Sequence, residues 1–212
     1  MFPAAFAIAF ALKTGSRFEE LVPGLIALAL FFGSTSMSAA SIMFERRLGS
    51  FERFLLFPIS YTIIALGKTL SSFFFGILSS IVTLVIVFSL APVPIYSSFL
   101  LLCYTILSTF MFSAFGVAIC YMLKEPSQTM TVFNAIRFPM MFLSGIFIPI
   151  EKTPLILQII SLILPLTYSV EGMRYSIMGK AYINPWISLP VTAFLSIVFL
   201  LLTAYEIKLS MP

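Results

Sequence analysis

The densest group of charged side chains in this sequence lies in the segment 45–58. Its candidate functional residues are Glu45, Arg46, Arg47, Gly49, Glu52 and Arg53. Carboxylates interspersed with guanidinium groups suit a contact with a surface of complementary charge, and the apolar residues between them suit a helix lying along a membrane surface. This segment therefore offers contact with a partner protein, or alternatively with anionic lipid headgroups at about 1 kcal/mol per cation.

Two further places carry charge at spacings that have a chemical meaning. Glu171 and Arg174 are three residues apart, so on a helix they lie on one face and can form an ion pair. Arg137 lies inside an apolar stretch, where a cation marks a candidate functional site. Its candidate partners are Glu45, Glu52 and Glu125. The alternative that we favour is an arginine whose side chain reaches the headgroups without a partner.

Other kinds of chemistry are excluded by composition, because the sequence contains no His and all of its acidic residues are Glu. A zinc protease needs histidine ligands and an aspartyl protease needs two Asp. No Gly-x-x-x-x-Gly-Lys-Ser/Thr loop is present to hold the phosphates of ATP. Cys103 and Cys120 lie in one apolar run, where thiols act as packing residues. We therefore expect no enzyme, metal or cofactor in this chain, so any ATP and Mg must be bound by a partner.

The elements that position these residues are predicted to be membrane helices. The sequence is 60% hydrophobic and 9% charged, where a soluble domain has about 25% charged residues. About 20 apolar residues suffice to cross a bilayer as a helix. We predict an all-α, polytopic membrane helix bundle with spans at residues 21–44, 59–90, 97–123, 127–148 and 186–206. The formal charge of +4 lies largely in short loops between these spans, which is typical of membrane topology and does not indicate nucleic-acid binding.

Three segments do not fit a full span. Residues 1–12 form an apolar helix of only about 18 Å, so we expect a partial first span that lacks its N-terminal half. The segment 45–58 is expected to lie along the cytoplasmic surface, because its arginines cluster in one short loop. Residues 149–180 hold several prolines and a short apolar stretch, which predict a re-entrant or interfacial region on the opposite, outer side.

Motifs in these segments resemble those of type-2 ATP-binding cassette transporter permeases, the membrane subunits of many bacterial and archaeal exporters. The family stretch E-R-x-x-G-T-x-E-x-L-L-x-x-P-(I/V)-S is matched by ERRLGSFERFLLFPIS at 45–60, with Ser50 in place of the usual Thr. The family signature L-S-G-x-x-x-P, then P-L-(T/S)-Y and R, is matched by LSGIFIP at 143–149, PLTY at 165–168 and Arg174. The entry into the family's second helix is similar to FEELVPGLIA at 18–27.

This resemblance implies a six-helix membrane domain, here with a truncated first helix, that works in the cell membrane. It implies a pairing with a second copy or a paralogue, and with two copies of a cytoplasmic ATPase that binds ATP and Mg. The segment 45–58 would then be the coupling helix that receives the movement of the ATPase. The expected function is export of a hydrophobic or amphipathic substrate such as a drug, a lipid or a lipid-linked glycan. The alternative is a self-contained secondary transporter or channel.

The outer side carries a second candidate site in this interpretation. Its residues are Ser144, Gly145, Pro149, Glu171 and Arg174. A helix that breaks at Ser144-Gly145 and turns back into the membrane suits an outer gate in the translocation path. An ordinary helix terminus with a capping Gly is an equally good interpretation. Glu171 and Arg174 would shape the exit, or would form an ordinary interfacial pair worth below about 1 kcal/mol.

Overall fold

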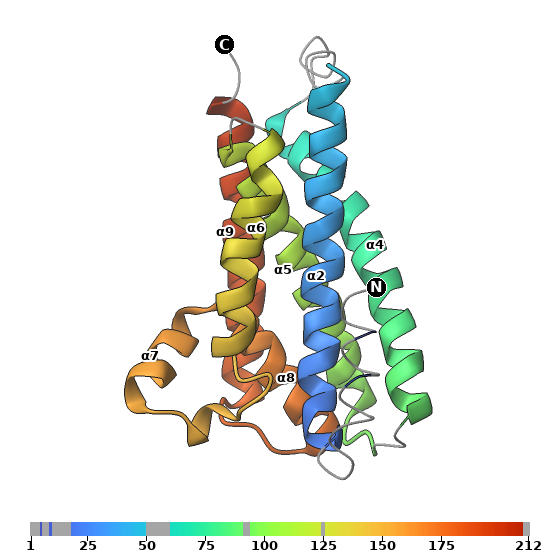
Figure 1. The fold of residues 1–212 in the computed structure, drawn as a ribbon, viewed down its shortest axis with the longest axis vertical. Helices are drawn as coiled ribbons and strands as arrows, with labels where there is room; N and C mark the ends of the chain where they lie inside the picture. The colour runs from blue at the N-terminus through green and yellow to red at the C-terminus, as the bar shows by residue number, and fades with distance from the viewer. Residues whose placement is uncertain are drawn as a thin grey trace.

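The computed structural model is a bundle of long helices (Figure 1), and it describes residues 18–49, 60–90, 94–123 and 126–209 together with Ala5 and Ala9. The long helices are α2 (Phe18–Arg47), α4 (Tyr61–Leu90), α5 (Ser98–Met122), α6 (Pro126–Leu143) and α9 (Pro185–Leu209). Three shorter helices lie between α6 and α9, namely η2 (Ile150–Lys152), α7 (Leu155–Ile163) and α8 (Pro165–Met178). The described residues form no strand, so the predicted all-α membrane bundle is confirmed.

Four of these helices, α2, α4, α5 and α9, are long and apolar enough to cross a membrane. The helices α7 and α8 meet at a bend of 97°, which is the geometry of a broken span or a re-entrant loop. The chain is therefore a multi-pass membrane protein. At one end of the bundle, the Glu45 end, α2 ends and α4 begins; at the other, the Glu171 end, α2 begins and α8 lies (Figure 1).

The helix bounds differ from the predicted spans at several places. Helix α2 begins at Phe18 and continues to Arg47, into the segment predicted to lie along the surface. Helix α6 ends at Leu143, before the predicted end at residue 148, because Gly145 takes a left-handed φ of 77°. The region 149–180 holds η2, α7 and α8. The predicted partial span at 1–12 and residues 50–58 of the coupling segment lie outside the described residues, except for Ala5 and Ala9.

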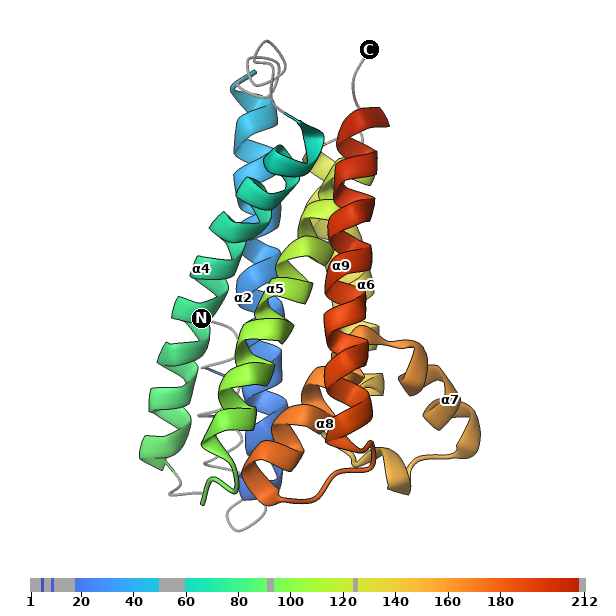
Figure 2. The same cartoon turned by 180° about the vertical axis from the view of Figure 1, so that it is seen from behind.

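Helix α2 packs against α4 and α5, behind which it lies in Figure 2. Its side chains from Val22 to Phe31 are almost all buried. Small residues permit this close approach. At Gly76 of α4, an added Cβ would lie against the Ser34 side chain of α2 and 2.8 Å from Thr109 Cγ2 of α5. Buried hydroxyls in this region bond to carbonyls one turn earlier, as Ser38 Oγ does with Ser34 O at 3.0 Å.

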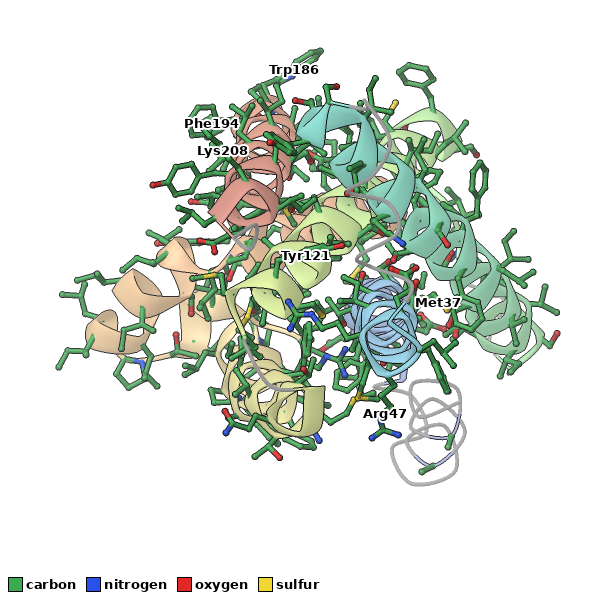
Figure 3. All side chains as sticks on the ribbon, turned by 90° about the horizontal axis from the view of Figure 1, so that it is seen from above. Met37, Arg47, Tyr121, Trp186, Phe194 and Lys208 are labelled. Carbon is green, nitrogen blue, oxygen red and sulfur yellow. The ribbon has the colours of Figure 1, made fainter. Side chains whose placement is uncertain are left out.

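Aromatic side chains lie both on the outer surface and in the interior of the bundle. Trp186 is 84% exposed and points away from α9, as Phe194 does on the same helix (Figure 3). Tyr121 of α5 is buried inside the bundle near the Glu45 end. Cys120 is also buried and Cys103 is half-buried. These positions agree with the prediction that both cysteines act as packing residues. The exposed aromatic and aliphatic side chains of α4 and α9 form the surface that faces lipid.

Candidate functional site

The Glu45 end joins three helices through the last turn of α2. The ammonium group of Lys68 in α4 forms an ion pair with Glu45 Oε1, and Ser41 Oγ donates to the same oxygen at 3.4 Å. Arg46 Nη1 donates to the carbonyl oxygen of Leu123, the C-cap residue that follows the last residue of α5. Glu45 and Arg46, which were both predicted as coupling residues, therefore tie the end of α2 to α4 and to α5.

The chain turns away from α2 directly after these contacts. Leu48 N donates to Phe44 O at 3.0 Å and Gly49 N donates to Arg46 O at 3.3 Å, which closes the last turn of the helix. Gly49 has a left-handed φ of 65°, so it terminates α2 as a glycine C-cap does. Gly49, one of the predicted coupling residues, is thus the point at which the chain leaves α2. Arg47 lies in the last turn of α2, whereas Glu52 and Arg53 lie outside the described residues.

The charges of the Glu45 end are only partly shielded from the surroundings. The side chains of Lys68 and Glu45 are 13% and 21% exposed. The guanidinium carbon of Arg46 also lies 5.6 Å from the centre of the Tyr121 ring, which attracts the cation through its π face. A pocket of about 300 Å³ opens between α2 and α4 beside the ion pair. This end therefore presents charge and an open surface at the start of the segment that was predicted to contact a partner.

The Glu171 end has a different construction, because its contacts join short segments. Glu171 is 0% exposed, and its Oε1 accepts from Arg174 Nη1 at 2.5 Å. Glu171 Oε2 accepts from the backbone N–H of Tyr182 at 2.6 Å. Arg174 Nη2 donates to the carbonyl oxygen of Gly145 at 2.6 Å. One buried ion pair thus links the turn after α6, the helix α8 and the loop before α9.

The turn at Ser144-Gly145 is held by its own backbone as well as by Arg174. Ser144 N donates to Met140 O at 3.0 Å and Ser144 itself is buried. Gly145 has φ 77°, and an added Cβ there would lie 2.8 Å from Ile150 Cγ1. Pro149 precedes η2 and, with Arg174, lines an open pocket of about 510 Å³. The structure therefore places all five predicted residues of this site in one region, at a helix terminus with a left-handed glycine.

Arg137 belongs to neither end. It lies on α6 with its side chain 3% exposed, and its guanidinium carbon is 4.7 Å from the centre of the Phe133 ring and 5.2 Å from that of Phe32. Glu45, one of its three predicted partners, is paired with Lys68 instead. The other two, Glu52 and Glu125, lie outside the described residues. The favoured alternative, a side chain that reaches the headgroups, is not what the structure shows, because aromatic rings enclose the cation.

Sequence reasoning missed several partners in both regions. Lys68 was not singled out, although an antiparallel pair of helices places a residue of early α4 opposite the end of α2. The Leu123 carbonyl and the Tyr182 N–H are backbone groups, which no side-chain pattern can indicate. The aromatic contact of Arg137 did have a local signal, because Phe133 precedes it by four residues and so lies on the same face of α6.

Comparison with known proteins gives one family match and several relatives. The family model described as ABC-2 type transporter matches residues 1–178. The chain is 28% identical over 158 residues to the "Putative transport permease ycf38" of Cyanophora paradoxa, which covers 72% of this chain and 53% of that protein. It is 22% identical over 187 residues to the "Probable multidrug ABC transporter permease YbhS" of Escherichia coli strain K12, covering 87% of this chain and 48% of the relative.

A third relative is the "Inner membrane transport permease YadH" of the same Escherichia coli strain. It is 23% identical to this chain over 164 residues, covering 77% of this chain and 64% of the relative. The chain therefore spans about half the length, or somewhat more, of the curated relatives that it matches. The matched residues include both ends of the bundle, since residue 178 is the last residue of α8.

Proposed function

Because this chain belongs to the ABC-2 type transporter family, we propose that it is the permease subunit of an ATP-driven exporter in the cell membrane. Two copies of a cytoplasmic ATPase bind ATP and Mg, and the permease pairs with a second copy or a paralogue. The names of two relatives support this assignment, since one is called an inner membrane transport permease and the other a probable multidrug ABC transporter permease. The substrate is accordingly a hydrophobic or amphipathic molecule, such as a drug, a lipid or a lipid-linked glycan.

The observation that carries this proposal is the anchoring of the end of α2 to two other long helices. The segment 45–58 begins where Glu45 is paired with Lys68 of α4 and Arg46 is bonded to Leu123 at the end of α5. When the ATPase subunits close on this segment, its movement is passed to α2, α4 and α5 together. A surface loop that only anchored lipid would not need these contacts to the ends of two other helices.

The Glu171 end is proposed as the outer gate. Arg174 connects the turn after α6 to α8, and α8 follows α7 at a bend of 97°. Movement of α6 would therefore displace α7 and α8 as one block and open the path for release of substrate. The pocket of about 510 Å³ beside Pro149 and Arg174 lies at this exit.

The positions of the carboxylates support this proposal over a transporter that works alone. A transporter driven by an ion gradient usually has ionisable groups at mid-membrane for coupling. In α2 and α9 the described carboxylates, Glu19, Glu20, Glu45 and Glu206, lie in the first or last turn of the helix. In the described part of the chain, the charged residues that lie inside a long helix, away from its first and last turns, are Arg137 of α6 and Lys68 near the start of α4.

The experiment that tests the proposal is co-purification of the permease with a candidate ATPase in mild detergent, followed by measurement of ATP hydrolysis. We expect the wild-type pair to co-purify. The double variant Glu52→Arg, Arg53→Glu reverses the charges of the coupling segment and should lose the ATPase. Lys68→Met should keep the ATPase bound but lower transport per ATP hydrolysed, because the end of α2 is no longer held against α4.

The matched control is Lys208→Gln, which removes one exposed cation from α9 at the same end of the bundle. It should behave like wild type in both measurements. If no ATPase associates with the wild-type permease, the exporter assignment is wrong and a self-contained transporter replaces it. If the ATPase binds but the charge-reversed variant is equally well coupled, the segment 45–58 is not the coupling element.

A further inference from the structure

Helix α5 has bonded contacts at both ends of the bundle. At the Glu45 end, the carbonyl oxygen of its C-cap residue Leu123 accepts from Arg46. At the Glu171 end, the N-cap residue Ser97 donates its backbone N–H to Ser176 O of α8 at 2.9 Å, and the residue before it donates to Ile177 O at 3.1 Å. One helix therefore joins the start of the predicted coupling segment to the short helix of the outer site.

The side chain of Tyr104 adds a further contact between α5 and the Glu171 end. It is fully buried, and its ring lies against Gly172 of α8, where an added Cβ would overlap the ring. The Tyr104 hydroxyl forms a hydrogen bond with Ser188 Oγ at 2.6 Å and donates to Pro185 O at 3.0 Å, both in the first turn of α9. The ring is stiff, because only two side-chain dihedral angles orient it. Helix α5 thus holds α8 and α9 through one rigid side chain.

Helices α5 and α9 lie side by side and form one long unit (Figure 2). Thr203 Oγ1 of α9 donates to Ala114 O of α5 at 3.2 Å, and Ser196 Oγ lies 3.5 Å from Leu107 O. The residues of each pair are 89 positions apart in the sequence, so the two helices are parallel and keep one register. Helices packed in this way move together, because a packed interior is hardly compressible and transmits strain.

Helix α5 is also better suited than α6 to carry a displacement from one end of the bundle to the other. A displacement at one end of a helix reaches the other end only if the helix does not bend between them. Helix α5 has 25 residues without a proline, and the rise from Tyr104 to Leu123 corresponds to about 28 Å along its axis. Helix α6 contains Pro139, which removes a backbone hydrogen bond and favours a kink. A displacement of Leu123 therefore reaches Tyr104 with little loss.

We propose that α5 transmits the movement of the coupling segment to the outer gate, and that Tyr104 is the positioning residue through which α5 moves α8. When the end of α2 moves, Arg46 displaces Leu123 and with it α5. The Tyr104 ring, held in the notch at Gly172, carries α8 along, and the ion pair inside the block keeps its other segments attached. This inference rests on the proposed function, because it requires an ATPase that moves the segment 45–58.

The test places an environment-sensitive fluorophore at the outer gate of the purified complex of permease and ATPase. The fluorophore is attached to Lys180→Cys, an exposed position that lines the pocket of about 510 Å³, in a background with Cys103→Ala and Cys120→Ala. The permease is labelled before the ATPase is added. We expect ATP binding to change the fluorescence of the labelled complex. Tyr104→Met should reduce this change at least about fivefold, because its flexible side chain fills the space without holding α8.

Further measurements separate a positioning role from a general loss of structure. In Tyr104→Met, ATPase binding and the rate of ATP hydrolysis should stay unchanged, while transport per ATP hydrolysed falls together with the fluorescence change. Tyr104→Phe keeps the ring in the notch and should retain most of the change. The matched control is Phe110→Met, which removes a ring of α5 that packs on Phe73 of α4 with the ring centres 6.2 Å apart. It should respond like wild type.

Three outcomes overturn this inference and leave the permease assignment intact. A full fluorescence change in Tyr104→Met shows that another route, such as α6, moves the gate. An equal loss in Phe110→Met shows that the packing of α5 matters in general and that Tyr104 has no special role. Coupled transport without any change at position 180 shows that the gate lies elsewhere.

Two further cases complete the design. If Tyr104→Met does not fold, Tyr104→Leu takes its place with the same expected loss, since it also lacks the ring and the hydroxyl. A wild-type permease that never associates with an ATPase overturns the proposed function and this inference together. The two failures are therefore distinguished by whether the wild-type complex forms.

Discussion

The two ends of the bundle both contain a glutamate paired with a cation, but the pairs connect different parts of the chain. At the Glu45 end, Glu45 and Lys68 come from two long helices and both remain partly exposed. At the Glu171 end, Glu171 and Arg174 come from one short helix, and Glu171 is fully buried. The first pair links the ends of long elements, whereas the second holds a turn, a short helix and a loop in one block.

This difference indicates how stability and movement are divided in the protein. A buried pair whose partners are all satisfied is costly to break, because the remaining charge stays desolvated. A partly exposed pair contributes little to stability, since water solvates either partner when the other is removed. We therefore expect the Glu171 end to keep its internal contacts and to move as one rigid block. We expect the Glu45 end to matter mainly for the transmission of movement.

The largest expected effect comes from Glu171→Ala. This change leaves the Arg174 guanidinium without its carboxylate and the Tyr182 N–H without its acceptor. We expect the free energy of unfolding to fall by about 3 kcal/mol, measured by denaturant titration in dodecyl maltoside. Glu151→Gln, an exposed carboxylate of the same end, is the control and should change the stability little. Equal losses in both variants would contradict the assignment of Glu171 as the centre of this block.

The next effect tests the body of the bundle that lies between the two ends. Gly76→Ala places a methyl group against the Ser34 side chain and 2.8 Å from Thr109 Cγ2. We expect a loss of about 2 kcal/mol, because a packed interior resists added volume. The control is Gly67→Ala on the same helix, where the added methyl group has nothing within 4 Å. That variant should gain up to about 1 kcal/mol from helix propensity.

A somewhat smaller effect is expected at the turn after α6. Gly145→Ala forces an L-residue into φ 77° and brings its Cβ to 2.8 Å from Ile150 Cγ1. We expect the free energy of unfolding to fall by about 1.5 kcal/mol. Gly145→Asn should cost less than Gly145→Ala, because Asn adopts the left-handed conformation more readily. If both variants are as stable as wild type, the turn does not depend on its glycine.

The smallest effect on stability is expected from Lys68→Met. We expect a change below about 1 kcal/mol, because the pair with Glu45 is partly exposed. Transport per ATP hydrolysed should nevertheless fall. At the Glu171 end, by contrast, we expect the main effect to be a loss of stability. The charge-swapped variant Glu45→Lys, Lys68→Glu restores the attraction and should recover transport. A large loss of stability in Lys68→Met would remove the distinction between the two ends.

The sequence predicted the elements better than the contacts between them. Long apolar runs require helices in a membrane, so the all-α bundle followed from hydropathy and proline positions. The pair Glu171 and Arg174 and the break at Gly145 were also predictable, because their signals are local in the sequence. Their joint hydrogen bond through the Gly145 carbonyl was not predictable, since it joins segments 29 residues apart.

Contacts between long helices depend on rotation and depth, which local patterns do not contain. Lys68 meets Glu45 because α4 begins at Tyr61 and turns one face toward the end of α2. A shift of one residue in either helix would rotate these side chains by about 100°. The burial of Arg137 between Phe133 and Phe32 depends in the same way on how α6 packs against α2. The end of α6 before residue 148 depended on the backbone conformation that one glycine takes.

The helix α7 has a consequence for the membrane around the protein. It projects from the bundle at the Glu171 end, with Leu155 and Ile163 exposed at its two ends and aliphatic side chains between them (Figure 1). Exposed aliphatic groups of this size must be covered by hydrocarbon, so α7 occupies area in one leaflet only. The described part of the chain is therefore broader in that leaflet than in the other. Such a wedge shape is best accommodated where the bilayer bends, and we expect the protein to collect in membrane of matching curvature.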